Sequence, residues 1–205
     1  MTKNSRTSTS SQVSEMKIIL DLCGGTGAWS RPYLDHGYDV RNITLPDYDV
    51  RTYNPPDNVY GILAAPPCTM FSLARTRAKI PRDFRKGMEL VISCLNIIWK
   101  YQYGNKLKFW CLENPMGYLR KFLGNPVFTF NPCDFGDNYT KKTDLWGYFN
   151  IPQKNPTPLL PFEKYLCSQN KRKLPSISDF TGSKQATRRA ITPPGFAKAF
   201  FEANQ

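Results

Sequence analysis

Apolar runs of strand length alternate with stretches of helix length along this 205-residue chain. The runs that predict strands are 17–22, 39–45, 59–64, 107–112 and 142–149, and 128–135 is a candidate hairpin partner for the last of them. The stretches that predict helices are 27–35, 84–101 and 194–204. This order of strands and helices predicts an α/β fold with a mostly parallel sheet and flanking helices.

Composition sets the expected boundaries of this fold. Residues 1–15 are polar and lack the apolar stretch of a secretory signal, which predicts a disordered leader. Between about 150 and 184 the chain is rich in Pro, Lys, Ser and Asn, which indicates an extended connection. A hydrophobic content of 40% over this length is enough for one core, so we expect a single domain over 16–205.

Charge and cysteine content narrow the function. Lys and Arg total 28 against 16 Asp and Glu, a net charge of +12 that favours a polyanionic partner such as nucleic acid. The six cysteines contain no Cys-x-x-Cys pair and His36 is the only histidine, which argues against a metal site and against a Ser-His-Asp or Cys-His mechanism. No apolar run is long enough to span a membrane, and the lack of an export signal predicts reduced thiols and a cytoplasmic location.

A glycine-rich turn follows the first predicted strand, in the sequence Asp21-Leu22-Cys23-Gly24-Gly25-Thr26-Gly27. Glycines let the backbone approach a ligand closely, so the turn is a candidate cofactor loop; the alternative is a plain tight turn. Asp47 and Asp49 follow the second strand, where a carboxylate can accept hydrogen bonds from ribose hydroxyls or, for Asp49, from an adenine amino group. Their alternative role is that of solvated turn acids.

Cys68 follows the third strand in the rigid frame Ala65-Pro66-Pro67-Cys68. The loop after it is basic, and cations there would favour the nucleophilic thiolate and contact phosphate. The basic residues of this loop are Arg75, Arg77, Lys79, Arg82, Arg85 and Lys86. In the alternative interpretation, Cys68 is a small buried hydrophobe and the loop is a solvated surface.

Glu113 and Asn114 follow the strand at 107–112. Ligands of open α/β sheets bind at the carboxyl ends of parallel strands, so we expect Glu113, Cys68 and Asp21 to share one site with an acid after the second strand. In the alternative interpretation, Glu113 is a strand-end acid that caps a loop.

Together these motifs resemble those of the C5-cytosine DNA methyltransferases, over about 17–204. Residues 21–27 resemble the family's S-adenosylmethionine motif, Pro66-Pro67-Cys68 with Phe71-Ser72 its Pro-Cys nucleophile loop, and Glu113-Asn114 its Glu-Asn motif. Weaker likenesses are Asp49-Val50 to the adenine-contacting acidic motif, 134–142 to the stretch before the arginine motif, and 189–199 to the final helix. The resemblance implies a Rossmann-like class I methyltransferase fold and S-adenosylmethionine as cofactor. The residues it assigns to the cofactor are Asp21, Leu22, Cys23, Gly24, Gly25, Gly27, Asp47, Asp49 and Pro66.

The implied reaction uses the thiolate of Cys68, which attacks C6 of cytosine and makes C5 nucleophilic toward the cofactor's methyl group. The resemblance assigns Glu113 to bind or protonate N3 of the ring and Asn114 to orient Glu113. Lys142 is the best match for the family's catalytic arginine motif. In duplex DNA the cytosine must also be flipped out of the stack.

Three features depart from the family. Asp144 stands where the second arginine of that motif would fall, and Pro115 follows Glu-Asn where the family usually has valine. Only the stretch at about 150–184 stands in place of a sizeable target-recognition region. Contacts from Lys171, Arg172 and Lys173 in that stretch are therefore expected to go to phosphate, with low sequence specificity.

The sequence thus predicts a minimal DNA cytosine-C5 methyltransferase. Single-stranded DNA, RNA or a free cytosine nucleotide stay open as substrates. An inactive nucleic-acid-binding protein on the same fold is the alternative from another class.

Overall fold

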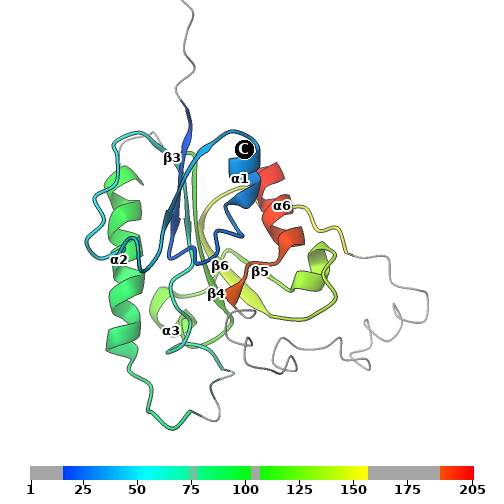
Figure 1. The fold of residues 1–205 in the computed structure, drawn as a ribbon. Coiled ribbons are helices and arrows are strands. Elements are labelled where there is room, and N and C mark those ends of the chain that lie inside the picture. The colour runs from blue at the N-terminus through cyan, green and yellow to red at the C-terminus, as the bar shows by residue number, and fades with distance from the viewer. Residues whose placement is uncertain (1–15, 74, 76–77, 103–106, 157–189) are drawn as a thin grey trace, which may run out of the picture.

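A six-stranded mixed sheet forms the centre of the computed structural model, which describes residues 16–73, 75, 78–102, 107–156 and 190–205 (Figure 1). The strands are β1 (Ile18–Leu22), β2 (Asp39–Ile43), β3 (Val59–Ala64), β4 (Phe109–Pro115), β5 (Phe128–Phe130) and β6 (Thr143–Tyr148). The expected leader at 1–15 and most of the expected connection at 150–184 lie outside the described residues.

The strand order is β2-β1-β3-β4-β6-β5. β1 runs parallel to β2 and β3, and β3 runs parallel to β4, whereas β6 is antiparallel to both β4 and β5. The predicted mostly parallel arrangement is therefore confirmed for the first four strands in this order, and the last two form the antiparallel pair that the hairpin hypothesis predicts. β5 and β6 have no helical crossover between them, and strands joined without a crossover pair antiparallel.

The four parallel strands end in register at one edge of the sheet. Leu22 of β1 pairs with Ile43 of β2 and Ala64 of β3, and Ala64 pairs with Leu112 of β4. The residues that follow these four positions therefore emerge side by side, as the sequence predicted for the carboxyl ends of the strands.

The helices agree with prediction where the apolar pattern is long. α2 (Phe84–Gln102) and α6 (Pro194–Ala203) lie within a residue of their predicted limits. The helix predicted at 27–35 is reduced to α1 (Arg31–Asp35), because Gly25 and Gly27 have positive φ angles that a right-handed helix does not allow. The short helix α3 (Arg120–Leu123) was not predicted.

The segment at 128–135 divides into two elements. β5 pairs with β6, as the hairpin hypothesis predicts, but Pro132–Phe135 is a 3-10 helix. The side chains of Asn131 and Asp134 form a reciprocal capping box at its start, which ends the strand.

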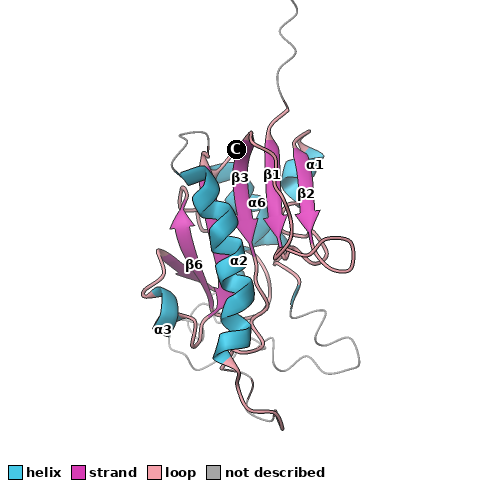
Figure 2. Cartoon of the chain, turned by 90° about the vertical axis from the view of Figure 1, so that its left-hand side faces the viewer, coloured by secondary structure: helices cyan, strands magenta, loops and turns pink. Residues whose placement is uncertain are grey.

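Helices cover both faces of the sheet: α2 lies on one face, and α1 and α6 lie on the other (Figures 1 and 2). The α2 side is mainly aliphatic, with Val91 and Ile98 in the same core as Leu20, Ile62 and Leu112. The α6 side is aromatic, and its largest buried rings are those of Trp29, Tyr33, Phe109, Phe130, Phe196 and Phe200. Ring packing on this scale fixes α6 against the sheet.

The end of α6 is also fixed by polar contacts. Tyr33 Oη donates to the Asn204 carbonyl (3.1 Å), and the Asn204 amide both accepts from the Asn150 N–H (2.8 Å) and donates to the Asn150 carbonyl (3.0 Å). These bonds join the end of β6 to the end of the described chain. Within the described part of the chain, no helix is long and apolar enough to cross a membrane.

Candidate active site

Cys68 lies in a loop that leaves β3 and is anchored to both neighbouring strands. The Ala65 N–H donates to the Leu22 carbonyl of β1 (2.9 Å), and the Asn114 amide of β4 donates to the Pro66 carbonyl (2.9 Å). The Cys68 carbonyl then accepts from the N–H groups of Phe71 and Ser72 (2.9 and 2.8 Å) and closes a turn. Cys68 itself is half-buried at the start of this turn.

The far side of the turn is held against the segment that follows β4. Ser72 and Gly117 form an isolated antiparallel bridge, and the Tyr118 N–H donates to the Phe71 carbonyl (2.9 Å). A Cβ on Gly117 would lie 2.3 Å from the Phe71 carbonyl oxygen, so only glycine allows the two backbones to approach this closely.

Arg82 completes the anchoring of the Cys68 loop. Its Nη1 and Nη2 donate to the carbonyls of Met70 and Ser72 (2.9 Å each), and its guanidinium lies 4.8 Å from the centre of the Tyr118 ring. Arg82 was predicted to contact nucleic acid, but in the structure its guanidinium holds the loop backbone.

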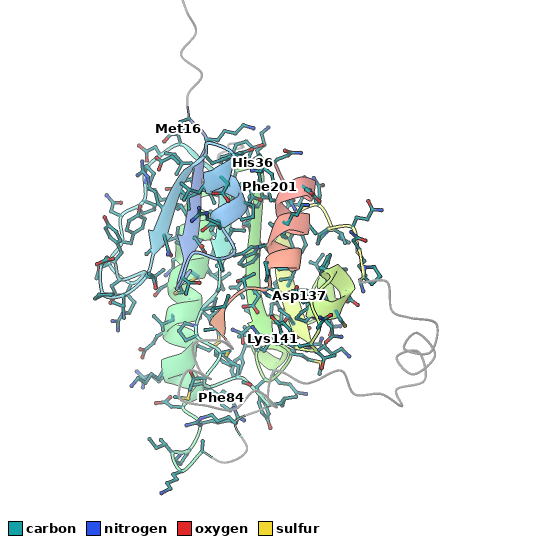
Figure 3. The ribbon with its side chains drawn as sticks, turned by 45° about the vertical axis from the view of Figure 1, so that its right-hand side comes forward. Met16, His36, Phe84, Asp137, Lys141 and Phe201 are labelled. Carbon is teal, nitrogen blue, oxygen red and sulfur yellow. The ribbon has the colours of Figure 1, made fainter. Side chains whose placement is uncertain are left out.

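Glu113 and Lys141 form an ion pair at the same edge of the sheet. Lys141 Nζ lies 3.6 Å from Glu113 Oε1, and the two side chains are only 10% and 14% exposed. Lys141 comes just before β6, near the end of the molecule where α2 begins at Phe84 (Figure 3).

The lysine at the site is therefore Lys141 and not Lys142, which was predicted as the catalytic residue. Lys142 is exposed, and its carbonyl accepts from the Met116 N–H (2.8 Å). Successive side chains of an extended chain point to opposite sides, so only one of two adjacent lysines can face Glu113.

The charges of this pair act on Cys68 in opposite directions. Burial raises the pKa of the Cys68 thiol, the Glu113 carboxylate raises it further, and Lys141 lowers it in part. Among the described residues, the cation that favours the thiolate is Lys141 and not one from the basic loop, and the pKa of Cys68 is raised overall. The physical reason is that desolvation and a nearby carboxylate outweigh the cation.

Asn114 does not orient Glu113 as predicted. Its amide nitrogen holds the Pro66 carbonyl, and its Oδ1 is buried with no hydrogen-bond partner among the described residues. Asn114 thus positions the loop that carries Cys68.

The glycine-rich turn after β1 is close-packed on one side and open on the other. A Cβ on Gly24 would lie 2.3 Å from Asp21 Cγ and 2.5 Å from Asn42 Oδ1, whereas a Cβ on Gly25 would meet nothing within 4 Å. Cys23, Gly25 and Gly27 all have positive φ angles, which turn the chain sharply. The open side at Gly25 is where a ligand can approach the backbone.

Two buried oxygens beside Gly24 lack a hydrogen-bond donor among the described residues. Ser30 Oγ donates to Asp21 Oδ2 (2.6 Å), but Asp21 Oδ1 has no partner, and Asn42 Oδ1 has none either. The Asn42 amide nitrogen donates to the Gly25 carbonyl (3.0 Å). Burial raises the pKa of Asp21 to about 6. Unpartnered buried acceptors of this kind point to a missing donor.

The two acids after β2 differ in their surroundings. Asp47 is exposed, whereas Asp49 is half-buried and bound by Arg51, with Nε 2.9 Å from Oδ1 and Nη2 2.5 Å from Oδ2. Hydrogen bonds from Arg51 lower the pKa of Asp49 to about 2. A ligand at this position would share the Asp49 carboxylate with Arg51.

Asp144, at the position where the resemblance would place a second arginine, is fully buried and belongs to the scaffold. Its carboxylate accepts from Arg120 Nε (2.6 Å), Arg120 Nη2 (2.5 Å) and Thr129 Oγ1 (2.8 Å). These bonds join β6 to α3 and β5.

The remaining basic residues of the sequence hypothesis divide into two groups. Arg75 is half-buried and Lys79 is exposed. Arg77, Lys171, Arg172 and Lys173 lie outside the described residues. Sequence reasoning missed Lys141, Ser30, Asn42 and Gly117; only Lys141 left a signal, as the neighbour of the predicted lysine.

Comparison with protein-family models gives no match for this chain, and comparison with curated protein sequences gives no significant match. Among the described residues, no group of three or more His, Cys, Asp or Glu side chains could hold a metal ion.

Proposed function

We propose that this chain transfers a methyl group from S-adenosylmethionine to C5 of cytosine in DNA through a covalent bond between Cys68 Sγ and C6. The observation that carries the proposal is the Glu113–Lys141 pair, whose two charges both act on the Cys68 thiol. A nucleophile, an acid and a cation at one sheet edge are the groups that addition to a pyrimidine requires.

The residues near the glycine-rich turn fit the proposed cofactor. The unpartnered oxygens of Asp21 and Asn42 suit a ligand that carries N–H donors, and Gly25 leaves the backbone open to it. The Ala65–Leu22 hydrogen bond ties this turn to the Cys68 loop, so a ligand on the turn lies beside the nucleophile. When bound, S-adenosylmethionine supplies a methyl group whose bond to sulfur breaks, leaving the electron pair on sulfur, as its bond to C5 forms.

The chain's own residues carry the addition and the elimination. The Cys68 thiolate forms a bond to C6, and the π-electron pair of C5=C6 becomes available at C5 while Glu113, protonated, holds N3 of the ring. After methylation, a base from solvent removes the C5 proton. The C5–H electron pair restores the double bond, and the bond between C6 and Sγ breaks to return the thiolate.

The raised pKa of Cys68 is consistent with this sequence of steps. Before cytosine binds, Cys68 is a thiol beside the Glu113 carboxylate, and the reaction needs the proton on Glu113 instead. Contact between Glu113 and N3 favours the protonated carboxyl and removes the negative charge that raises the pKa of Cys68. Lys141 balances the charge of Glu113 at each return to the carboxylate.

The proposal is tested by transfer of labelled methyl from S-adenosylmethionine to cytosine-containing DNA. The intact chain should label the DNA, Cys68→Ser and Glu113→Gln should lose labelling, and Cys133→Ser should keep it as a matched control in a half-buried cysteine. DNA with 5-fluorocytosine should form a complex that survives denaturation, because fluorine cannot leave C5 as the proton does. Labelling of RNA or dCMP alone would reassign the substrate. Binding of cofactor and DNA without any labelling would instead support the inactive binding protein.

A further inference from the structure

Aromatic side chains are exposed beside the Cys68 loop. Tyr118 is 39% exposed and Phe122, in α3, is 46% exposed. Both rings pack on the half-buried ring of Phe84, with centroid distances of 5.6 and 5.5 Å. Clustered exposed rings on a protein surface indicate a binding surface. We call Tyr118 and Phe122 the aromatic platform.

Cations surround the aromatic platform. The Arg82 guanidinium lies over the Tyr118 ring, Arg85 and Lys86 are exposed next to Phe84 in the chain, and Lys121 is exposed next to Phe122. The acid in this group, Asp83, caps α2 by accepting from the Lys86 N–H (2.9 Å). Exposed rings among cations match a ligand that presents flat bases on a phosphate backbone.

The platform is rigidly joined to the Cys68 loop. Phe71, which closes the turn that begins at Cys68, is fully buried and packs on Phe84 and Phe122, with centroid distances of 6.2 and 6.0 Å. The Phe71 carbonyl also accepts from the Tyr118 N–H. α3 lies beside the first turns of α2 in both ribbon views (Figures 1 and 2). A strand of nucleic acid on the platform would therefore stay close to Cys68.

We propose that Tyr118 and Phe122 stack with unpaired bases that flank the target cytosine, so that the chain acts on single-stranded DNA in preference to duplex. In a duplex each base is covered on both faces by its neighbours, whereas an unpaired base is free to stack on a protein ring. A single strand also needs no base flipping before Cys68 reaches C6. The choice of cytosine as target rests on the proposed function, but binding by the platform does not.

The test is fluorescence anisotropy of a labelled 20-nucleotide cytosine-containing strand, its duplex and its RNA equivalent, with the full chain. Intact protein should bind the single strand more tightly than the duplex. Replacing Tyr118 and Phe122 together with Ala should weaken single-strand binding by about 10- to 100-fold and change duplex binding little. A matched control replaces two exposed aromatic residues outside the platform, Tyr148 (72% exposed) and Trp99 (47% exposed), with Ala and should bind as the intact chain does.

Two further variants separate stacking from folding. Tyr118→Phe keeps the ring and should bind normally, whereas Phe122→Leu keeps an apolar side chain without the ring and should bind more weakly. The inference would be overturned if the intact chain bound strand and duplex with equal affinity. It would also be overturned if the double variant, melting as the intact chain does, bound the single strand with unchanged affinity. Tighter binding of the RNA strand would overturn the choice of DNA.

Methyl transfer, measured separately, distinguishes this inference from the proposed function. If the variant with Ala at both Tyr118 and Phe122 transferred methyl groups to duplex DNA as fast as the intact chain does, the proposed function would stand and the role of the platform would be contradicted. Weakened strand binding by the double variant, in a protein that transfers no methyl group, would leave the platform standing and remove the function.

Discussion

Glu113 at the end of β4 and Lys141 before β6 form a largely buried ion pair, with 3.6 Å between Oε1 and Nζ. The pair lies where β4 and β6 meet in antiparallel register, and both of its charges act on the Cys68 thiol. The reactivity of Cys68 therefore depends, besides its burial, on two residues far apart in the sequence, one in β4 and the other just before β6.

Changing either partner should move the pKa of Cys68 in a known direction. Glu113→Gln removes a carboxylate that raises the pKa, so iodoacetamide should alkylate Cys68 faster at neutral pH; Lys141→Met removes a cation that lowers it, so alkylation should be slower. A pKa change of about one unit changes the thiolate fraction, and the rate, by about tenfold. Peptide mass spectrometry against pH measures this rate, with Cys133 as the internal reference. Identical profiles in the three proteins would show that the pair does not control the thiol.

The buried carboxyl of Asp21 should make stability depend on pH. Its pKa is about 6 in the folded chain against an ordinary 3.8, so the folded state binds the proton more tightly than the unfolded state does. The contribution is fully present below about pH 4 and is lost as pH rises through about 6, a change of about 3 kcal/mol. Asp21→Asn keeps the acceptor for Ser30 and stays neutral. Urea unfolding of both proteins at pH 4 and pH 8 should therefore show the variant gaining about 3 kcal/mol relative to the intact chain. A difference between the proteins that stays constant with pH would contradict this assignment.

The positions of the parallel strands along the chain were predictable because buried parallel strands leave continuous apolar runs, as at β1 and β3. α2 was predictable from its length. α1 was overestimated because the residues before Arg31 have apolar and small side chains that fit either state, while positive φ at Gly27 is decided by the turn. The antiparallel pairing of β6 with β4 was not derivable from the pattern of β6, since the alternation of side chains is the same in parallel and antiparallel strands.

The candidate site was predictable to the level of strand ends and no further. Cys68, Glu113 and Asp21 follow apolar runs directly, so their shared edge follows from parallel register. The sequence could not predict which lysine pairs with Glu113, because Lys141 and Lys142 are chemically equivalent and their exposure depends on where β6 starts. The role of Arg82 depends on two carbonyls whose positions exist only in the folded loop.

Arg82 and Lys86 are both basic residues of the segment that follows Cys68, but their substitution should affect different properties: loop anchoring for Arg82 and the salt dependence of DNA binding for Lys86. Arg82→Ala removes two hydrogen bonds to the Cys68 loop, so methyl transfer should fall more than tenfold. The loop should also be cleaved faster by thermolysin, a protease that does not cut at Lys or Arg and so is not affected by loss of the arginine itself. Lys86 is exposed, and Lys86→Ala should lower the slope of log K against log salt by about one. The affinity of each variant for DNA, measured from about 50 to about 300 mM salt, separates the two roles. A reduced slope for Arg82→Ala with normal loop cleavage would restore Arg82 as a phosphate contact.

Gly117 should tolerate no side chain, because its Cβ would lie 2.3 Å from a backbone oxygen. Gly117→Ala is expected to cost about 1–3 kcal/mol of stability and to displace the Cys68 loop, so methyl transfer should fall by more than the fraction of unfolded protein explains. Gly37→Ala is the comparison: its Cβ would meet nothing within 4 Å, so any loss of stability there comes from the positive φ of Gly37 and not from a clash, and methyl transfer should be unaffected. Thermal melting and activity at a temperature where both variants are folded give the comparison. Normal activity of Gly117→Ala would show that the close approach is not needed to position Cys68.

Arg120 and Asp144 should differ in what their removal costs, because only the carboxylate is fully buried. Arg120→Met leaves Asp144 with the Thr129 hydroxyl as its one remaining side-chain donor among the described residues, and loss of a partner to a buried charge costs about 3–5 kcal/mol. Asp144→Asn leaves Arg120, which is 34% exposed, in contact with water and with an amide oxygen, so it should cost less. Urea unfolding of Arg120→Met, of Asp144→Leu and of the variant with both substitutions completes a double-mutant cycle, in which the double variant should be more stable than Arg120→Met alone. Asp144→Arg introduces the arginine that the sequence resemblance would place here, and it should unfold the chain, because two guanidinium groups would then meet where one carboxylate is buried. If Asp144→Arg folded and gained activity, the buried pair would not be the reason for the departure at this position.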